Sequence, residues 1–221
     1  MPLRIAHCSD IHLLQLKGTP PWSYLNKRLT GAANLVLKRG RKHDGSVFET
    51  LVHHVRELEV DRLVITGDLV NLSLPSEFAH VKNTLQQAGI DVTVIPGNHD
   101  TYTKHSARKN LFEFYLGRFM EGERVSGHAY PFIQRYDGDV ALIGTSTAIP
   151  RPVLDARGRL GSGQLKRLER MLVSLANEAR LRVVLIHHPP LEGASKPGHE
   201  LIDLQDFADV IQRAGADLVL F

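Results

Sequence analysis

The sequence of 221 residues predicts a layered α/β fold, and three observations support this prediction. Short apolar runs of strand length alternate with longer segments whose apolar residues recur at helical spacing. Glycine, proline and Asp-Gly signals separate these segments. Polar residues of a few chemical types follow four of the apolar runs. Alternation of strand and helix is typical of layered α/β folds, in which ligands bind beyond the carboxyl ends of the strands.

The first half of the chain predicts three strands and three helices. Ser46 and Glu49 have the spacing of a capping box, while Pro75 and Gly89 are placed to begin and end a helix. The apolar run at 3–10 has the pattern of a buried strand. We expect strands over 3–10, 61–68 and 91–100, and helices over 46–59, 75–89 and 110–120.

The second half begins with a predicted hairpin and then resumes the alternation. Two strands lie within 132–146, and Asp137-Gly138 between them is a strong hairpin signal. A helix over 162–179, a strand over 182–190, a helix over 201–215 and an apolar strand over 216–221 follow.

Composition fits an ordinary globular protein and predicts a single domain over 1–221. Hydrophobic residues make up 43% and charged residues 23%, and no apolar run approaches the ~18 residues that span a bilayer. Residues 1–14 lack the continuous apolar region of a signal peptide. Cys8 is the single cysteine, which excludes an internal disulfide and fits a reducing compartment. We therefore expect a cytoplasmic protein.

Positive charge is concentrated in a basic insertion at 16–43. From Ile11 to His43 there are seven Lys and Arg residues and no Asp or Glu, whereas the rest of the chain has 20 basic and 24 acidic residues. The insertion has three interpretations: a solvated, partly helical excursion, a cap that draws anionic substrate to the active site, or a peripheral contact with acidic lipid headgroups. Aromatic residues are few and no recognition motif is present, so nucleic acid is not an expected partner.

Four predicted strand ends have metal-ligand chemistry. They are Asp10-Ile11-His12, Gly67-Asp68, Gly97-Asn98-His99-Asp100 and His187-His188. Each fragment alone is common turn chemistry, but four in order at strand exits indicate a metal site. Carboxylate, imidazole and amide ligands suit Mn²⁺, Fe or Zn²⁺. If strand geometry persists, Asp10 and His12 point the same way, and the two glycines remove side chains that would crowd an ion.

These motifs, as "SDIH" (9–12), "TGDLV" (66–70), "PGNHD" (96–100) and "IHHPP" (186–190), resemble those of the calcineurin-like metallophosphoesterases. The resemblance spans essentially the whole chain and is greatest to the bacterial cyclic-nucleotide phosphodiesterase-like branch. It implies a four-layer α-β-β-α sandwich. It also implies two divalent metal ions and hydrolysis of a phosphoester, with a phosphodiester favoured, by a metal-activated hydroxide.

The resemblance also implies residue roles. Asp10 and His12 bind the first metal, Asp68 bridges both metals, and Asn98 and His187 bind the second. His99 faces the phosphate and protonates the leaving oxygen or stabilises its charge, and Asp100 orients His99. Small phosphoesters, including cyclic nucleotides and lipid-derived diesters, all remain open as substrates.

The remaining histidines have lesser expected roles. We expect His188 to shape the pocket and keep His199 as a further pocket candidate. No function is expected for His7, His53, His54 and His80.

One motif of the family is not found in 1–221. The family has Gly-His-x-His after a further strand, whereas "PGHE" (197–200) contains Gly-His without the second histidine and precedes a helix. "ADLVLF" (216–221) resembles the strand before that motif, so we expect an enzyme truncated at its C-terminal strands, with weak metal binding and low turnover. The alternative is a non-catalytic member that binds a metal or a partner.

Overall fold

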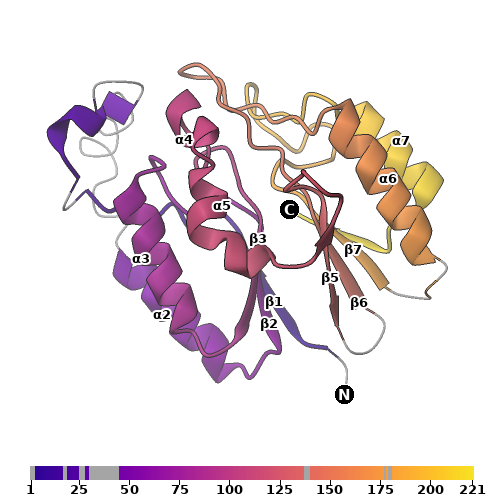
Figure 1. Ribbon diagram of the computed structural model, residues 1–221, viewed down its shortest axis with the longest axis horizontal. Coiled ribbons are helices and arrows are strands. Elements are labelled where there is room, and N and C mark those ends of the chain that lie inside the picture. The colour runs from indigo at the N-terminus through magenta and orange to yellow at the C-terminus, as the bar shows by residue number, and fades with distance from the viewer. Residues whose placement is uncertain are drawn as a thin grey trace.

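The computed structural model describes residues 3–16, 19–24, 28–29, 45–136, 140–176, 178 and 181–221. Figure 1 shows four layers: helices α2 and α3, a sheet containing β1–β3, a second sheet containing β5–β7, and helices α6 and α7. This arrangement confirms the predicted α-β-β-α sandwich. Most of the basic insertion lies outside the described residues, so its role as a cap or lipid contact stays a prediction.

The first sheet is parallel, in the order β1-β2-β3. All four residues of β2 are buried, whereas β1 is half-buried to exposed. The prediction of a buried first strand is therefore wrong, because β1 is an edge strand that pairs only with β2 among the described strands. The elements of this half are β1 (Ile5–Cys8), η1 (Pro21–Tyr24), α2 (Gly45–Glu57), β2 (Arg62–Ile65), α3 (Pro75–Gln86) and β3 (Asp91–Val94).

The second sheet is mixed, in the order β4-β5-β6-β7-β8. The pairs β4–β5 and β5–β6 are antiparallel, whereas β6–β7 and β7–β8 are parallel. Residues 137–139, which include the predicted Asp137-Gly138 turn, lie outside the described residues. The elements are β4 (Glu123–Arg124), β5 (Phe132–Tyr136), β6 (Val140–Gly144), α6 (Ser162–Ala176), β7 (Leu181–Leu185), α7 (Leu204–Ala214) and β8 (Leu218–Leu220).

The second sheet is buried on both faces because its apolar side chains alternate between two cores. Val183 and Leu185 belong to the core that extends across the first sheet to α2 and α3. Val184 and Ile186 belong to the core shared with α6 and α7. Successive side chains of a strand point to opposite faces, so a continuous apolar run fits a strand between two layers.

Two connecting segments differ from the prediction. The helix expected over 110–120 is divided into α5 (Leu111–Leu116) and the 3₁₀ helix η2 (Gly117–Met120). A short helix, α4 (Lys104–Arg108), was not predicted; Thr103 caps it by accepting a hydrogen bond from Ser106 N. Short helices of this kind depend on local capping more than on apolar periodicity.

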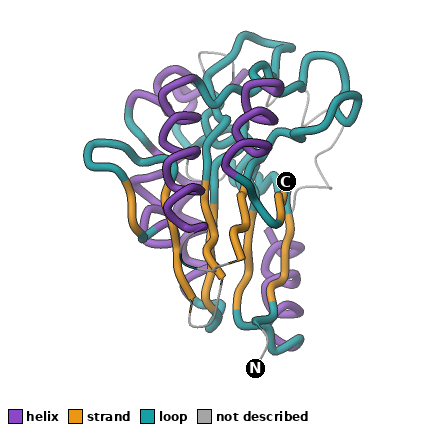
Figure 2. Tube along the Cα trace, turned by 90° about the vertical axis from the view of Figure 1, so that its right-hand side faces the viewer, coloured by secondary structure: helices purple, strands orange, loops and turns teal. Residues whose placement is uncertain are grey.

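Figure 2 shows the strands running from one end of the molecule to loops gathered at the other. The four predicted motifs follow β1, β2, β3 and β7 directly. They therefore meet at the carboxyl ends of these strands. No described helix is long and apolar enough to cross a membrane.

Candidate metal centre

The side chains of the first two motifs are brought together by left-handed backbone. Asp10, His12 and Asp68 have φ values of 57°, 51° and 51°. Strand β1 has already ended at Cys8, so the expected strand pleat does not extend to Asp10 and His12. Non-glycine residues adopt this conformation rarely, and when they do it is often at functional sites. Backbone hydrogen bonds from Asp10 N to Gly67 O (3.1 Å) and from His12 N to Asp68 O (2.8 Å) fix the two loops side by side.

Asp68 lies between two sets of potential ligands. Its Oδ2 is 3.7 Å from His12 Nε2, and its Oδ1 is 3.5 Å from His187 Nε2. His12 Nε2 is also 3.4 Å from Asp10 Oδ1. Among the residues that the structure describes, two groups have ligand atoms within 4.8 Å of one another: His12, Asp68 and His99, and Asp10, Asp68 and His187. The buried carboxylate of Asp68 belongs to both.

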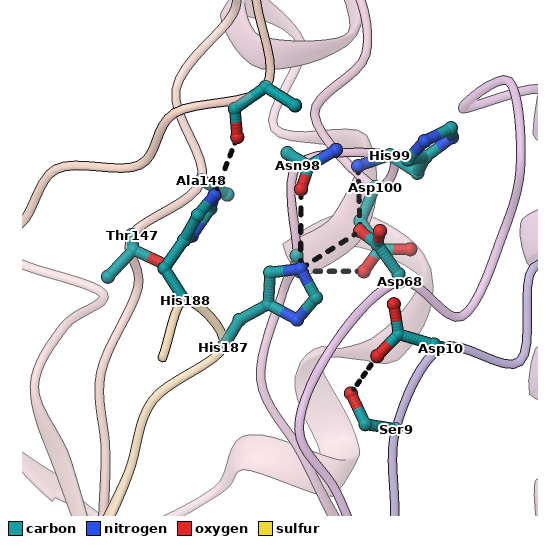
Figure 3. A network of polar contacts seen from close by, with 12 residues as sticks. Ser9, Asp10, Asp68, Asn98, His99, Asp100, Thr147, Ala148, His187 and His188 are labelled. Atoms are coloured by element: carbon teal, nitrogen blue, oxygen red, sulfur yellow. Dashed lines mark hydrogen bonds and ion pairs between the residues drawn. The ribbon is translucent and has the colours of Figure 1, made fainter. Parts of the chain in front are cut away.

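His187 joins this cluster from the second sheet. Its Nδ1 donates to Thr66 O (2.8 Å), which directs Nε2 towards Asn98 Oδ1 at 3.3 Å. Figure 3 shows His187 facing Asp68 and Asn98. A second hydrogen bond of this kind commonly fixes the tautomer and the ring orientation of a metal-binding histidine. The structure thus brings Asp10, His12, Asp68, Asn98 and His187 together.

Two glycines leave the space that Asp68 occupies. A Cβ atom on Gly97 would lie 2.2 Å from Asp68 Oδ1, and one on Gly67 would lie 2.7 Å from both Gly97 N and His187 Nδ1. Gly67 also has a φ of 101°. Because the donor set combines carboxylate, imidazole and amide oxygen around a cleared space, these residues fit divalent metal ions.

The electrostatics favour a charged site. The hydrogen bond from His12 holds the pKa of Asp10 well below its usual range despite burial. Burial alone would lower the pKa of His12, but the hydrogen bond to Asp10 and the charge of Asp68 outweigh it and raise the pKa. Burial would likewise raise the pKa of Asp68, but nearby His187, His99 and His12 lower it. Asp68 is therefore an anion ready to bind a cation.

We expected Asp100 to orient His99, but its carboxylate contacts backbone amides instead. The carboxylate of Asp100 accepts hydrogen bonds from Gly97 N (2.8 Å), Val70 N (3.0 Å) and Leu69 N (3.3 Å). The ring of His99 instead donates from Nδ1 to Asn71 O at 2.7 Å. Asp100 thus fixes the backbone of the two glycine-containing loops, because a buried carboxylate needs several donors. Burial and the charge of Asp68 raise the pKa of Asp100 to about 7.

The site opens into a pocket of about 630 Å³. Tyr102, Lys196, His199 and Phe221 line it together with the metal-site residues. Sequence patterns did not single out Tyr102, whose ring stacks on His99 with centroids 5.4 Å apart. Its position after "GNHD" on the turn was the one available signal.

The histidines for which no function is expected lie outside the site. His53, His54 and His80 lie on α2 and α3, beside Glu57 or Glu49, and His7 contacts Thr66 Oγ1.

His188 turns away from His187 and holds a loop. Thr147 Oγ1 lies 2.6 Å from its Nδ1, and its Nε2 donates to Ala156 O at 2.8 Å. Figure 3 shows the two histidines pointing to different sides. Both ring nitrogens are in use, so His188 contacts the pocket without offering a ligand atom.

The fold and the donor set together define a class, the four-layer α/β sandwiches with a candidate metal centre at the carboxyl ends of their strands. The model of the family described as "Calcineurin-like phosphoesterase" matches residues 3–221. The chain therefore belongs to this family of hydrolases.

Individual relatives agree with this membership. A 3',5'-cyclic-nucleotide phosphodiesterase of Nostoc sp. is 27% identical over 86% of this chain and 58% of its own length. A probable cyclic nucleotide phosphodiesterase of Fibrobacter succinogenes is 28% identical over 66% of this chain and 47% of its own. The chain thus spans about half the length of these curated relatives. The crystal structure of a dimetal phosphatase from Danio rerio shares the fold, with a TM-score of 0.67 and 14% identity over 98% of this chain and 79% of that one.

Proposed function

We propose that this protein hydrolyses small phosphodiesters with two divalent metal ions. The observation that carries the proposal is the position of Asp68. One carboxylate, 3% exposed, presents Oδ1 to His187 and Oδ2 to His12. A carboxylate with ligands on both sides suits the bridging position between two ions. By the family resemblance, Asp10 and His12 would bind one ion and Asn98 and His187 the other. The spacing of ligand atoms instead places Asp10 with His187 and His12 with His99 around Asp68.

Two bound divalent ions would supply an activated water and offset the negative charge of the phosphoryl group. The chain's own residues orient these groups. Thr66 O directs His187, the Asp10–His12 contact aligns the first ligand pair, and Asp100 fixes the loops that carry Asp68 and Asn98. Preorganised ligands of this kind lower the reorganisation needed during reaction.

His99 is the proposed general acid. Because Nδ1 donates to Asn71 O, the ring presents Nε2 to the other side, and His99 lines the pocket. Burial lowers the pKa of His99, and a phosphate anion in the pocket would favour the protonated ring again. A protonated Nε2 could then donate to the leaving oxygen.

A cyclic nucleotide is the substrate class that the relatives' names favour. The pocket volume of about 630 Å³ lies within the range of small-molecule sites and is compatible with a nucleotide. The ligand types suit Mn, Fe and Zn alike, so we propose these three metals as the candidates.

The test combines metal analysis with a substrate panel. The purified chain is assayed with Mn²⁺, Fe²⁺ or Zn²⁺ against bis(p-nitrophenyl) phosphate, p-nitrophenyl phosphate and 3',5'-cyclic AMP. We expect metal-dependent hydrolysis with the diesters preferred, and loss of at least ~10³-fold in kcat/KM with Asp68→Ala. Undiminished activity in Asp68→Ala would contradict the bridging role. Metal binding without hydrolysis of any substrate would favour the non-catalytic alternative.

A further inference from the structure

Arg28 is a buried cation within the basic insertion. It is 5% exposed, and its guanidinium donates from Nε to Leu72 O (2.7 Å), from Nη2 to Ser73 O (2.7 Å) and from Nη1 to Ser23 O (3.4 Å). A buried charge is costly unless hydrogen bonds satisfy it. The planar fork of arginine suits two adjacent carbonyl groups, a geometry that lysine cannot reproduce. Arg28 therefore has a structural partner, the turn at 71–74.

This turn is buried and has unusual backbone. Ser73 is fully buried and has a φ of 52°. Glu77 Oε2 accepts hydrogen bonds from Leu72 N (3.0 Å) and Leu74 N (2.9 Å). The guanidinium thus binds carbonyl groups of the turn, while the Glu77 side chain accepts hydrogen bonds from its amides. Left-handed backbone at a serine persists only where its surroundings enforce it.

The same turn holds His99 and the residues after it. Asn71 O accepts the hydrogen bond from His99 Nδ1 (2.7 Å), and Ser73 Oγ donates to His99 O (2.7 Å). Tyr102 N donates to Ser73 Oγ at 2.8 Å. The ring orientation and the backbone position of His99 therefore both depend on where the turn lies.

We propose that Arg28 is a positioning residue for His99, acting through the turn at 71–74. Arg28 fixes the carbonyls of Leu72 and Ser73. The turn then holds the imidazole of His99 through Asn71 O and the main chain of His99 through Ser73 Oγ. Arg28 of the basic insertion is thereby connected to His99 through hydrogen bonds on either side of the backbone of the turn. This inference rests on the proposed function, in which His99 acts on the phosphate.

The test compares Arg28→Ala with a matched control, Arg62→Ala. Arg62 is similarly buried, at 7% exposed, but it binds Thr93 Oγ1 (3.0 Å) and Asp91 Oδ2 (2.8 Å) at the start of β2, away from the site. Both variants remove a buried guanidinium and both should lower stability. We expect kcat on bis(p-nitrophenyl) phosphate to fall about 10- to 100-fold in Arg28→Ala, with KM little changed, and to stay near wild type in Arg62→Ala.

Chemical rescue separates positioning from general loss of structure. Guanidinium at low millimolar concentration should restore part of the kcat of Arg28→Ala, whereas sodium chloride at the same ionic strength should not. If Arg28→Ala fails to fold, Arg28→Lys replaces it, and we expect an intermediate kcat because an ammonium cannot reproduce the fork. Equal effects of the Arg28 and Arg62 variants on kcat would overturn the proposal.

A readout without catalysis keeps the two proposals apart. Hydrogen exchange followed by mass spectrometry should show faster exchange at 71–74 and 97–102 in Arg28→Ala than in Arg62→Ala. An inactive wild-type chain with this exchange pattern would refute the proposed function while supporting the connection from Arg28 to the His99 segment. Unchanged exchange at 97–102 would overturn the connection whatever the activity.

Discussion

At the scale of single residues, the site depends on backbone geometry as much as on ligand type. The proximity of Asp10, His12, Asp68, Asn98 and His187 was predictable because each follows a predicted strand, while their role as metal ligands stays a prediction. Their convergence through left-handed backbone was not predictable, because an Asp or His in sequence carries no signal of positive φ. The three amide contacts of Asp100 could not be predicted either, since they join loops distant in sequence.

Gly97 provides a test of the space around Asp68. In Gly97→Ala the new methyl group would lie 2.2 Å from Asp68 Oδ1 and must displace the carboxylate or the loop. We expect metal affinity to fall about 10- to 100-fold, as when a supporting contact of a metal ligand is lost. Isothermal titration with Mn²⁺ measures it. Gly163→Ala, in α6, is the control, because its Cβ would meet only Arg167 Nη1 at 3.5 Å. Equal Mn²⁺ affinity in the two variants would show that metal binding does not depend on the space that Gly97 leaves for Asp68.

Glu77 predicts a pH dependence of stability. Burial raises its pKa from 4.5 to about 8, although backbone hydrogen bonds and the charge of Arg28 act to lower it. A folded-state pKa above the unfolded value gives stability that is fully present below pH 4.5 and is lost as pH rises towards 8. Glu77→Gln keeps the shape and removes the titration, so the wild type should lose on the order of a few kcal/mol relative to Glu77→Gln between pH 5 and pH 8. Urea unfolding across this range measures the difference, and a difference that is constant with pH would refute the prediction.

At the scale of elements, strands and long helices were predictable and short connecting elements were not. The apolar runs of β2 and β7 are continuous because each is buried by neighbouring layers, and this pattern is visible in sequence. Helix α4 has five residues, too few for a periodic pattern, and depends on the cap at Thr103. The half-exposed β1 was mistaken for a buried strand because apolar content does not reveal which strand lies at an edge.

The two consecutive histidines after β7 have different contacts, and we therefore expect different roles: His187 faces Asn98, whereas His188 contacts Thr147 and Ala156. His188 is 3% exposed and holds the loop at 147–158 through Thr147 and Ala156, while a Cβ on Gly158 would lie 2.2 Å from its Nδ1. His188→Ala should speed hydrogen exchange across 147–158 and lower stability by ~2–4 kcal/mol, because a packed ring and two hydrogen bonds are lost. His54→Ala, whose side chain is 64% exposed on α2, is the control. Slow exchange retained at 147–158 in His188→Ala would show that the loop does not depend on this ring.

At the scale of the whole molecule, the candidate metal centre joins the two sheets. Asp10, Asp68 and Asn98 follow strands of the first sheet, whereas His187 follows β7 of the second. The fold class was predictable from the alternation of elements, but the way in which one site links the two sheets follows only from their packing. A ligand that binds the folded state alone stabilises it by mass action, so a bound ion should stabilise both layers together.

This linkage predicts a metal- and pH-dependent melting temperature. At a Mn²⁺ concentration of about 100 times Kd, the folded state gains ~2.7 kcal/mol, which for a chain of this size raises Tm by roughly 5–10 °C. The increase should be smaller at pH 5.5 than at pH 7.5, because the contacts of His12 raise its pKa and a protonated imidazole cannot bind metal. Differential scanning calorimetry with Mn²⁺ and with EDTA measures the shift at both pH values. Asp68→Asn should abolish most of it, since the bridging charge is removed while the side chain keeps its shape. An equal Tm increase in that variant would place the stabilising ion elsewhere in the molecule.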